Sequence, residues 1–242
     1  LENELSAYLN VKNCILSTSA TTSLDLILRA LEIEKKIVLV STNTFIATAA
    51  AIINSGAIPK PIDIDDDFTG ICPKALEHEL KKNKKKIGAV LIVHIGGLIT
   101  PKIKKIVKIC KKFDVKLIED CAQAFGSSYE NKIAGSFGIA GALSFQTTKV
   151  YTTGEGGCVL TNNDRIAKKI KSLRQFGVNF KKPLFHLMNG NNYKVSEFVA
   201  LAGVCELKRV NNRIKKRTLI AKRYQKLLKN TSWKTLAPSQ NS

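Results

Sequence analysis

Residues that can carry amine chemistry follow two of the apolar runs in this sequence. Asp120 and Gln123 come directly after the run 115–118, and a carboxylate in that position needs a cationic partner or water. Lys149 follows the apolar stretch that contains Ser144 and precedes a glycine-rich turn, so we expect its amine to point into a cleft. A desolvated lysine has a lowered pKa and can form a Schiff base. A single residue of this kind is usually on the surface. The combination and order of these four residues, framed by glycines, indicate instead that they belong to one binding or catalytic site.

A cluster of hydroxyl residues at 19–23 opens a helix predicted at 24–31. Hydroxyl side chains cap the start of a helix, and the free backbone N–H groups there bind phosphate well. Most clusters of this kind are only caps. Alone, this cluster is therefore weak evidence for phosphate binding near Ala20 and Thr21, and it gains weight only if other segments place ligand-binding residues beside it.

The elements that would position these residues alternate between strand and helix. This alternation favours a mostly parallel sheet covered on both faces by helices, and in such sheets ligands bind at the carboxyl ends of the strands. The run 57–63 contains Pro59 and Pro61, so we expect it at an edge or only partly paired. We predict strands at 14–16, 37–40, 57–63, 90–93, 115–118, 142–145 and 158–161, and helices at 24–31, 45–54, 73–82, 101–113, 164–176 and 196–228.

Length and composition restrict the class of protein. The chain has 242 residues, 44% of them hydrophobic and 24% charged, which is the balance of a globular protein with one large domain or two small ones. No apolar run approaches the roughly 18 residues of a membrane span, and Glu2 and Glu4 stand where a signal peptide needs an apolar core. Six scattered cysteines without a Cys-x-x-Cys pair favour a reducing cytoplasm over disulfides or a zinc site.

The histidines give no sign of a metal centre. His78, His94 and His186 do not have metal-ligand spacing, and no metal is expected. His94 ends a predicted strand and could line the cleft, but a structural role is at least as good an interpretation.

The net charge of +20 would suit nucleic acid, an anionic membrane surface or phosphorylated small molecules. The densest basic run, 81–86, stands in a predicted loop and has no interleaved aromatic residues, which a single-strand binder would use for stacking. We therefore interpret the charge mainly as lysines spread over helical surfaces, and we do not expect nucleic acid as the partner.

Taken in order, these segments resemble the DegT/DnrJ/StrS family of sugar aminotransferases, which depend on pyridoxal 5'-phosphate (PLP). The resemblance runs from about residue 1 to residue 224. The run 118–124 is similar to the family's strand-end motif, and Ser144 with Lys149 matches its Ser-Phe-x-x-x-Lys motif. The glycines at 154–157 match the turn after that lysine. The resemblance implies an α/β fold, the large domain of a type I aminotransferase.

The resemblance also implies a role for each matching residue. Asp120 would pair with the pyridine nitrogen of PLP, Gln123 would approach the ring oxygen, and Ser144 would contact the phosphate. Lys149 would be the Schiff-base lysine, and Phe45 would stack on the ring.

Two further segments complete the implied site. Ala20 and Thr21 would bring backbone close to the phosphate, with Ala20 replacing the glycine usual in the family. Asn192, in a loop at 190–193, would reach the phosphate of the neighbouring subunit of a homodimer.

The implied activity is amino transfer from L-glutamate or glutamine to a nucleotide-linked keto-sugar, in surface polysaccharide or amino-sugar biosynthesis in the cytoplasm. Some relatives are sugar dehydratases with a histidine in place of the lysine, and Lys149 argues against that branch. A basic regulatory or nucleic-acid-binding protein that keeps the fold without catalysis is the alternative from another class.

The ends of the chain indicate a fragment or a trimmed product. The sequence begins at Leu1, and its one methionine is Met188. By the resemblance, 1–195 would be the PLP-binding large domain, truncated at its N-terminus. The segment 196–242 would be a long connecting helix and the start of a truncated C-terminal small domain, most of which is missing.

Overall fold

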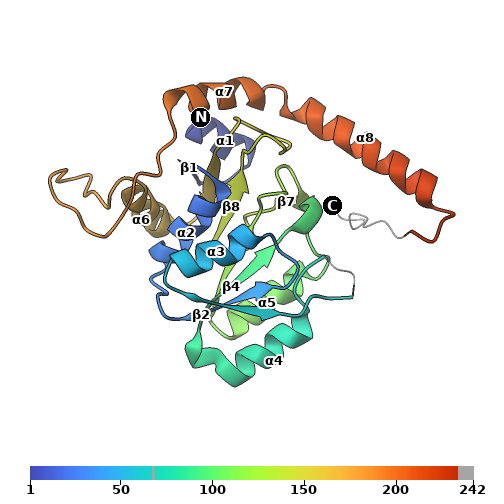
Figure 1. Cartoon of the computed structure of the whole chain (residues 1–242), viewed down its shortest axis with the longest axis horizontal. Coiled ribbons are helices and arrows are strands. Elements are labelled where there is room, and N and C mark those ends of the chain that lie inside the picture. The colour runs from blue at the N-terminus through green and yellow to red at the C-terminus, as the bar shows by residue number, and fades with distance from the viewer. Residues whose placement is uncertain (67–68, 234–242) are drawn as a thin grey trace.

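A computed structural model of the chain describes residues 1–66 and 69–233. Its main feature is one sheet in the order β1-β9-β8-β5-β4-β2-β3, visible at the centre of Figure 1. A small antiparallel hairpin, β6 (Ser128–Tyr129) with β7 (Lys132–Ile133), lies outside it. The strands of the sheet are β1 (Asn13–Ser17), β2 (Ile37–Ser41), β3 (Ile58–Ile62), β4 (Ile87–Val93), β5 (Lys116–Asp120), β8 (Ala140–Ser144) and β9 (Gly157–Thr161).

The predicted mostly parallel sheet is confirmed. Strands β3, β2, β4, β5 and β8 run parallel to one another, so the carboxyl ends of these five strands share one edge. The predicted edge strand is also correct, because β3 ends the sheet, with Pro59 and Pro61 paired to β2. The sequence did not indicate that β9 runs antiparallel to both β8 and β1. Gly157, the first residue of β9, therefore lies opposite Ser17 at the carboxyl end of β1.

Helices cover both faces of the sheet. Successive strand residues point to opposite faces, and both faces carry apolar side chains that must be buried. Val38 and Val40 belong to a core with the apolar faces of α2, α3 and α6, whereas Leu39 packs into a second core with α1, α4 and α5. The helices are α1 (Glu2–Tyr8), α2 (Ala20–Ala30), α3 (Ile46–Asn54), α4 (Pro73–Asn83), α5 (Ile103–Lys112) and α6 (Asp164–Arg174), with short 3-10 turns η1 (Lys84–Lys86) and η2 (Ile95–Gly97).

The long helix predicted at 196–228 is wrong. The structure has two helices there, α7 (Glu197–Leu207) and α8 (Val210–Leu228). The chain turns at Arg209, whose N–H bonds the Glu206 carbonyl three residues back. The turn carries Val210 into the core, where it is completely buried. No glycine or proline marks the break, so helical periodicity runs through it.

Helix α8 rests on the body only through its first turns and then projects away from it (Figure 1). Ile214 packs against the core and lies next to Gly126, and Asn211 accepts a hydrogen bond of 2.6 Å from the Tyr8 hydroxyl. Farther along α8 the apolar side chains Leu219, Ile220, Tyr224 and Leu227 are exposed. The predicted segment 196–242 continues past this helix, and its residues 234–242 lie outside the described residues.

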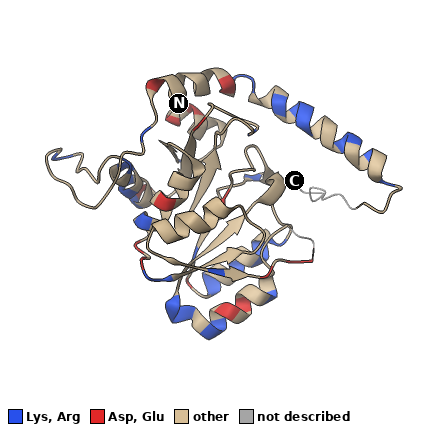
Figure 2. Ribbon diagram, viewed as in Figure 1, with Lys and Arg blue, Asp and Glu red and all other residues tan. Residues whose placement is uncertain are grey.

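The basic residues are spread over several helices, with groups on α4, α5 and α8 (Figure 2). Within the described residues, no helix is both long and apolar enough to cross a membrane. All six cysteines are free thiols.

Candidate functional site

One cavity of about 500 Å³ lies at the carboxyl edge of the sheet, between the ends of β5 and β8 and the first turns of α2 and α3. It brings together seven of the eight residues that the sequence proposed. These are Ala20, Thr21, Phe45, Asp120, Gln123, Ser144 and Lys149. The structure thus brings these residues together at the edge where the parallel strands end.

Asp120 ends β5 at the bottom of this cavity, with 5% of its surface exposed. The Thr48 hydroxyl donates a 2.7 Å hydrogen bond to its Oδ2, and the Ala122 N–H donates a 3.0 Å bond to its Oδ1. Burial raises the pKa of Asp120 above its ordinary value, and the two hydrogen bonds together with electrostatic interactions with His94 and Lys149 offset part of that rise. The carboxylate is therefore oriented by protein donors and calls for a positively charged partner.

Thr48 is a site residue that the sequence reading missed. It is completely buried on α3 and accepts a 2.7 Å hydrogen bond from the Thr44 hydroxyl, which fixes its own proton toward Asp120. The signal was present in the sequence as two threonines four residues apart around Phe45, the spacing that places them on one side of a helical turn.

The raised pKa of Asp120 predicts a pH-dependent stability for the protein without ligand. Because the folded state binds this proton more tightly than the unfolded state, stability from Asp120 is present below its ordinary pKa of about 3.9. It is lost as the pH rises through the raised folded value. We expect Asp120→Asn to gain stability relative to the native protein as the pH rises through that window, measured as urea midpoints. A difference that is constant with pH would contradict this.

Gln123 is held by the turn after β4. The Gly96 N–H donates a 2.7 Å hydrogen bond to Gln123 Oε1, so the amide NH2 group is the donor that Gln123 offers at the cavity. Gly96 has φ +63, a conformation that glycine adopts at little cost.

The start of α2 forms another wall of the cavity. Ser19 caps this helix and forms a reciprocal capping box with Thr22. The next N–H groups, those of Ala20 and Thr21, belong to the first turn, where a helix offers no internal acceptor. A phosphate or carboxylate at this end of the cavity would meet these donors and the positive end of the helix dipole.

Lys149 stands in a tight turn after β8. The turn is held by the Lys149 N–H, which donates to the Gln146 carbonyl, and by Thr148, whose N–H and hydroxyl both donate to Gln146 Oε1 at 2.9 and 2.6 Å. Beneath it, Phe145 and Tyr151 pack edge to face in the core. The Lys149 side chain is half-buried and lines the cavity.

Phe45 and Ser144 complete the wall. Phe45 precedes α3, and its ring is 66% exposed at the cavity. Ser144 is buried at the end of β8. Gln146, Thr148 and Glu155 also line the cavity, although the sequence did not single out their side chains.

Asn192 does not join this cavity. It is exposed in the segment after α6, where its Oδ1 accepts a 2.8 Å hydrogen bond from Lys194 Nζ. Its expected contact with the site of a neighbouring subunit stays a prediction.

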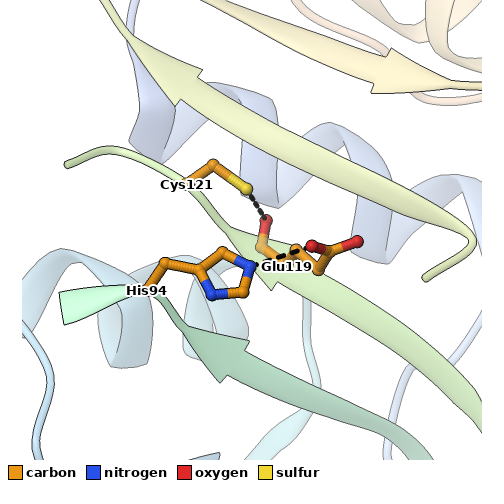
Figure 3. A group of neighbouring side chains, drawn as sticks. All are labelled: His94, Glu119 and Cys121. Atoms are coloured by element: carbon orange, nitrogen blue, oxygen red, sulfur yellow. Dashed lines mark hydrogen bonds and ion pairs between the residues drawn. The ribbon is translucent and has the colours of Figure 1, made fainter. Parts of the chain in front are cut away.

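His94, Glu119 and Cys121 form a buried cluster beside the cavity (Figure 3). Glu119 Oε2 bonds His94 Nε2 at 2.9 Å and the Gly135 N–H at 2.8 Å, and Oε1 accepts the Gly138 N–H at 2.7 Å. Burial, together with the neighbouring carboxylates, raises the pKa of the Cys121 thiol well above its usual value. The hydrogen bonds to Glu119 from His94 and the two glycine N–H groups are typical of a structural hydrogen-bond network.

The model of the DegT/DnrJ/EryC1/StrS aminotransferase family matches residues 1–242. The chain belongs to this family. Among curated family members it is 38% identical over 228 residues to the UDP-4-amino-4,6-dideoxy-N-acetyl-beta-L-altrosamine transaminase of Campylobacter jejuni (strain 81-176). It is 34% identical over 225 residues to the GDP-perosamine synthase of Vibrio cholerae. Each alignment covers 93% of this chain and 60% of the relative, so the chain spans less than two thirds of these DegT-family proteins.

Solved structures of the family have the same fold. A DegT DnrJ EryC1 StrS aminotransferase from Brucella abortus superposes with a TM-score of 0.92 at 27% identity, covering 99% of this chain and 65% of that one. The Helicobacter pylori aminotransferase PseC, involved in the biosynthesis of pseudoaminic acid, gives a TM-score of 0.87 at 28% identity, covering 96% of this chain and 62% of that one. The expected type I aminotransferase-like sheet with flanking helices is thus confirmed.

Proposed function

We propose that this chain is the cofactor-binding part of a PLP-dependent aminotransferase. It would transfer an amino group from L-glutamate, or glutamine, to a nucleotide-linked keto-sugar in amino-sugar or surface polysaccharide biosynthesis. The observation that carries the proposal is that Lys149, Asp120 and the first turn of α2 line one cavity. Family membership and the similarity to two nucleotide-sugar-processing relatives support the substrate class.

The donor set fits PLP. A buried carboxylate in need of a cation, Asp120, suits a protonated pyridine nitrogen, and the N–H groups of Ala20 and Thr21 with the Ser144 hydroxyl suit a phosphate. The exposed ring of Phe45 offers a flat surface for stacking. When bound, PLP supplies an aldehyde carbon that amines can attack and a ring that accepts the electron pair released at the substrate carbon.

The residues of the chain then have separate tasks. Lys149 would provide the amine that holds the cofactor, and its Nζ would carry a proton between the substrate carbon and a carbon of the cofactor. Asp120 would keep a proton on the ring nitrogen, and the Thr48 hydroxyl holds the Asp120 carboxylate in place. Gln123 would offer its amide N–H to the ring oxygen.

We propose two features of the whole protein as part of this function. Residues 1–195 act as the large domain, and 196–242 lead toward a C-terminal small domain. The protein is a homodimer in the cytoplasm, in which Asn192 reaches the phosphate in the partner's site.

The first test is a visible absorption spectrum of the purified chain with PLP. We expect a band that free PLP lacks, and we expect it to fall when glutamate is added. Borohydride reduction followed by peptide mass spectrometry should then locate the added mass on Lys149. If a sample with an intact circular dichroism spectrum takes up no PLP, the proposal is wrong. Steep salt-dependent DNA binding by that sample would favour the regulatory alternative.

The glycine at the start of β9 gives a sharper prediction. A Cβ on Gly157 would come within 2.5 Å of the Ser19 carbonyl carbon and 2.7 Å of the Ala20 nitrogen, whereas one on Gly154 would meet nothing within 4 Å. The same Cβ would lie 2.7 Å from the Leu143 carbonyl oxygen, so Gly157→Ala must displace the first turn of α2 or the end of β8, both of which line the cavity. We expect it to weaken PLP binding by about tenfold or more, which corresponds to roughly 1.4 kcal/mol.

Gly154→Ala is the matched control. Gly154 has φ +85, so alanine there introduces backbone strain without touching α2. The PLP affinities of both variants are measured by fluorescence titration, and that of Gly154→Ala should stay within about threefold of the native value. Equal losses in both variants would contradict the role given to the start of α2.

A further inference from the structure

A second cavity of about 290 Å³ adjoins the first on the other side of Lys149. The two cavities share Ala122, Gln123, Thr148 and Lys149. The second cavity is also lined by Arg217 of α8, a residue that neither the sequence motifs nor the proposed mechanism uses.

Arg217 reaches this place because α8 is anchored through one face. Val210, Ile214 and Arg217 follow one another at helical spacing. The first is completely buried, and the second packs against the core beside Gly126. Arg217 is thus the next residue of that face, and its Nη2 donates a 3.2 Å hydrogen bond to the Thr148 carbonyl, next to Lys149.

Arg217 is exposed, and its guanidinium has no ion-pair partner in the part of the chain that the structure describes. None of the ion pairs formed among residues 1–66 and 69–233 includes Arg217, whereas Arg209 and Arg213 on the same helix both pair with Glu206. The residues that line the second cavity include two cations, Lys149 and Arg217, and no carboxylate. A guanidinium with one N–H bonded to a carbonyl still has four donors for a planar, charged acceptor.

We propose that Arg217 and the cavity that it lines form a subsite for an oxyanion of the substrate, a carboxylate or a phosphate. Arginine recognises either group through two parallel hydrogen bonds. The hydrogen bond to Thr148 fixes the guanidinium one residue from Lys149, so an anion bound there places the rest of the molecule at the Lys149 amine. The subsite rests on the proposed function, in which that amine is the reacting group.

The test measures binding of two unreactive probes, inorganic pyrophosphate and glutarate, to the full chain by calorimetry. Pyrophosphate represents the diphosphate of a nucleotide-sugar, and glutarate represents the carboxylates of the amino donor. We expect Arg217→Ala to weaken binding of one probe at least tenfold. Arg217→Lys, which keeps the positive charge but not the planar pair of N–H donors, should give a smaller loss. The probe that loses affinity identifies the source of the oxyanion.

Arg223→Ala is the matched control, because it removes the same charge from the same helix and Arg223 lines neither cavity. In buffer with about 0.15 M salt, where exposed charges are screened beyond about 8 Å, it should change either affinity less than twofold. Equal losses in the Arg217 and Arg223 variants, or no loss for either probe in Arg217→Ala, would overturn the subsite.

The subsite and the proposed function can be rejected independently of each other. PLP uptake on Lys149 together with unchanged anion binding by Arg217→Ala would reject the subsite and retain the cofactor assignment. A chain that takes up no PLP would reject the proposed function, whatever the probes do.

Discussion

Lys149→Ala should abolish amino transfer while leaving the fold intact. The variant removes both the amine that holds the cofactor and the group that moves the proton, and general acid–base catalysis alone contributes about 10²–10⁴-fold. No ion pair or side-chain hydrogen bond of Lys149 occurs within residues 1–66 and 69–233, so its loss leaves no buried group without a partner. Stability should change by no more than about 0.5 kcal/mol.

The measurement is formation of 2-oxoglutarate from glutamate in a single turnover of the PLP-loaded protein, with urea unfolding in parallel. Lys149→Arg separates charge from chemistry, because an arginine keeps the positive charge but its guanidinium is not a usable nucleophile at neutral pH. Lys222→Ala, on the projecting part of α8, serves as the surface control. Amino transfer by Lys149→Ala at the native rate would show that Lys149 is not the residue that holds the cofactor and moves the proton.

Glu119→Gln is expected to be the most destabilising of the substitutions considered. Both carboxylate oxygens of Glu119 accept backbone N–H groups, from Gly135 and Gly138, and one of them also bonds His94. A glutamine must place its NH2 group against one of these donors, so two donors would face each other in a site with no exposed surface. Leaving buried polar groups unpaired costs about 1–3 kcal/mol each, and we expect a total loss of about 3 kcal/mol.

Urea unfolding of the protein without PLP measures this loss directly. Glu130→Gln, on the exposed turn between β6 and β7, is the control. It removes only an exposed ion pair with Lys104, and such pairs contribute little to stability, so the midpoint should stay nearly unchanged. His94→Gln should fall between the two, because it removes one of the three bonds and leaves both glycine donors satisfied. If Glu119→Gln unfolds at the native midpoint, Glu119 does not hold the cluster together.

The fold was predictable where local pattern and global packing agree. Alternating apolar runs and helical segments predicted the strands of the main sheet and most helices, but not the hairpin β6–β7, and Pro59 with Pro61 predicted the edge position of β3. The break between α7 and α8 was not predictable, because the burial of Val210 causes it and no glycine or proline marks it in the sequence. The antiparallel direction of β9 depends on which strands pair, which the apolar run at 158–161 does not encode.

The candidate site was predictable to the extent that it is built from strand ends. Asp120, Gln123, Ser144 and Lys149 follow adjacent strands of a parallel sheet, and that topology necessarily brings them together. Thr48 and Arg217 contact Asp120 and Thr148 from distant parts of the chain. Neither stands at a strand end, so only the packing of α3 and α8 against the sheet reveals them.

The pairing of β1 with β9 has a consequence for how the protein folds. Ser17 lies beside Gly157. Strand β1, which leads into α2, therefore joins the sheet only when it pairs with β9, the last strand of the sheet in the sequence. Contacts between such remote residues require closure of a large loop and form slowly. The wall of the cavity that carries Ala20 and Thr21 should therefore assemble late on the folding pathway, after the parallel strands β2, β4 and β5 have paired.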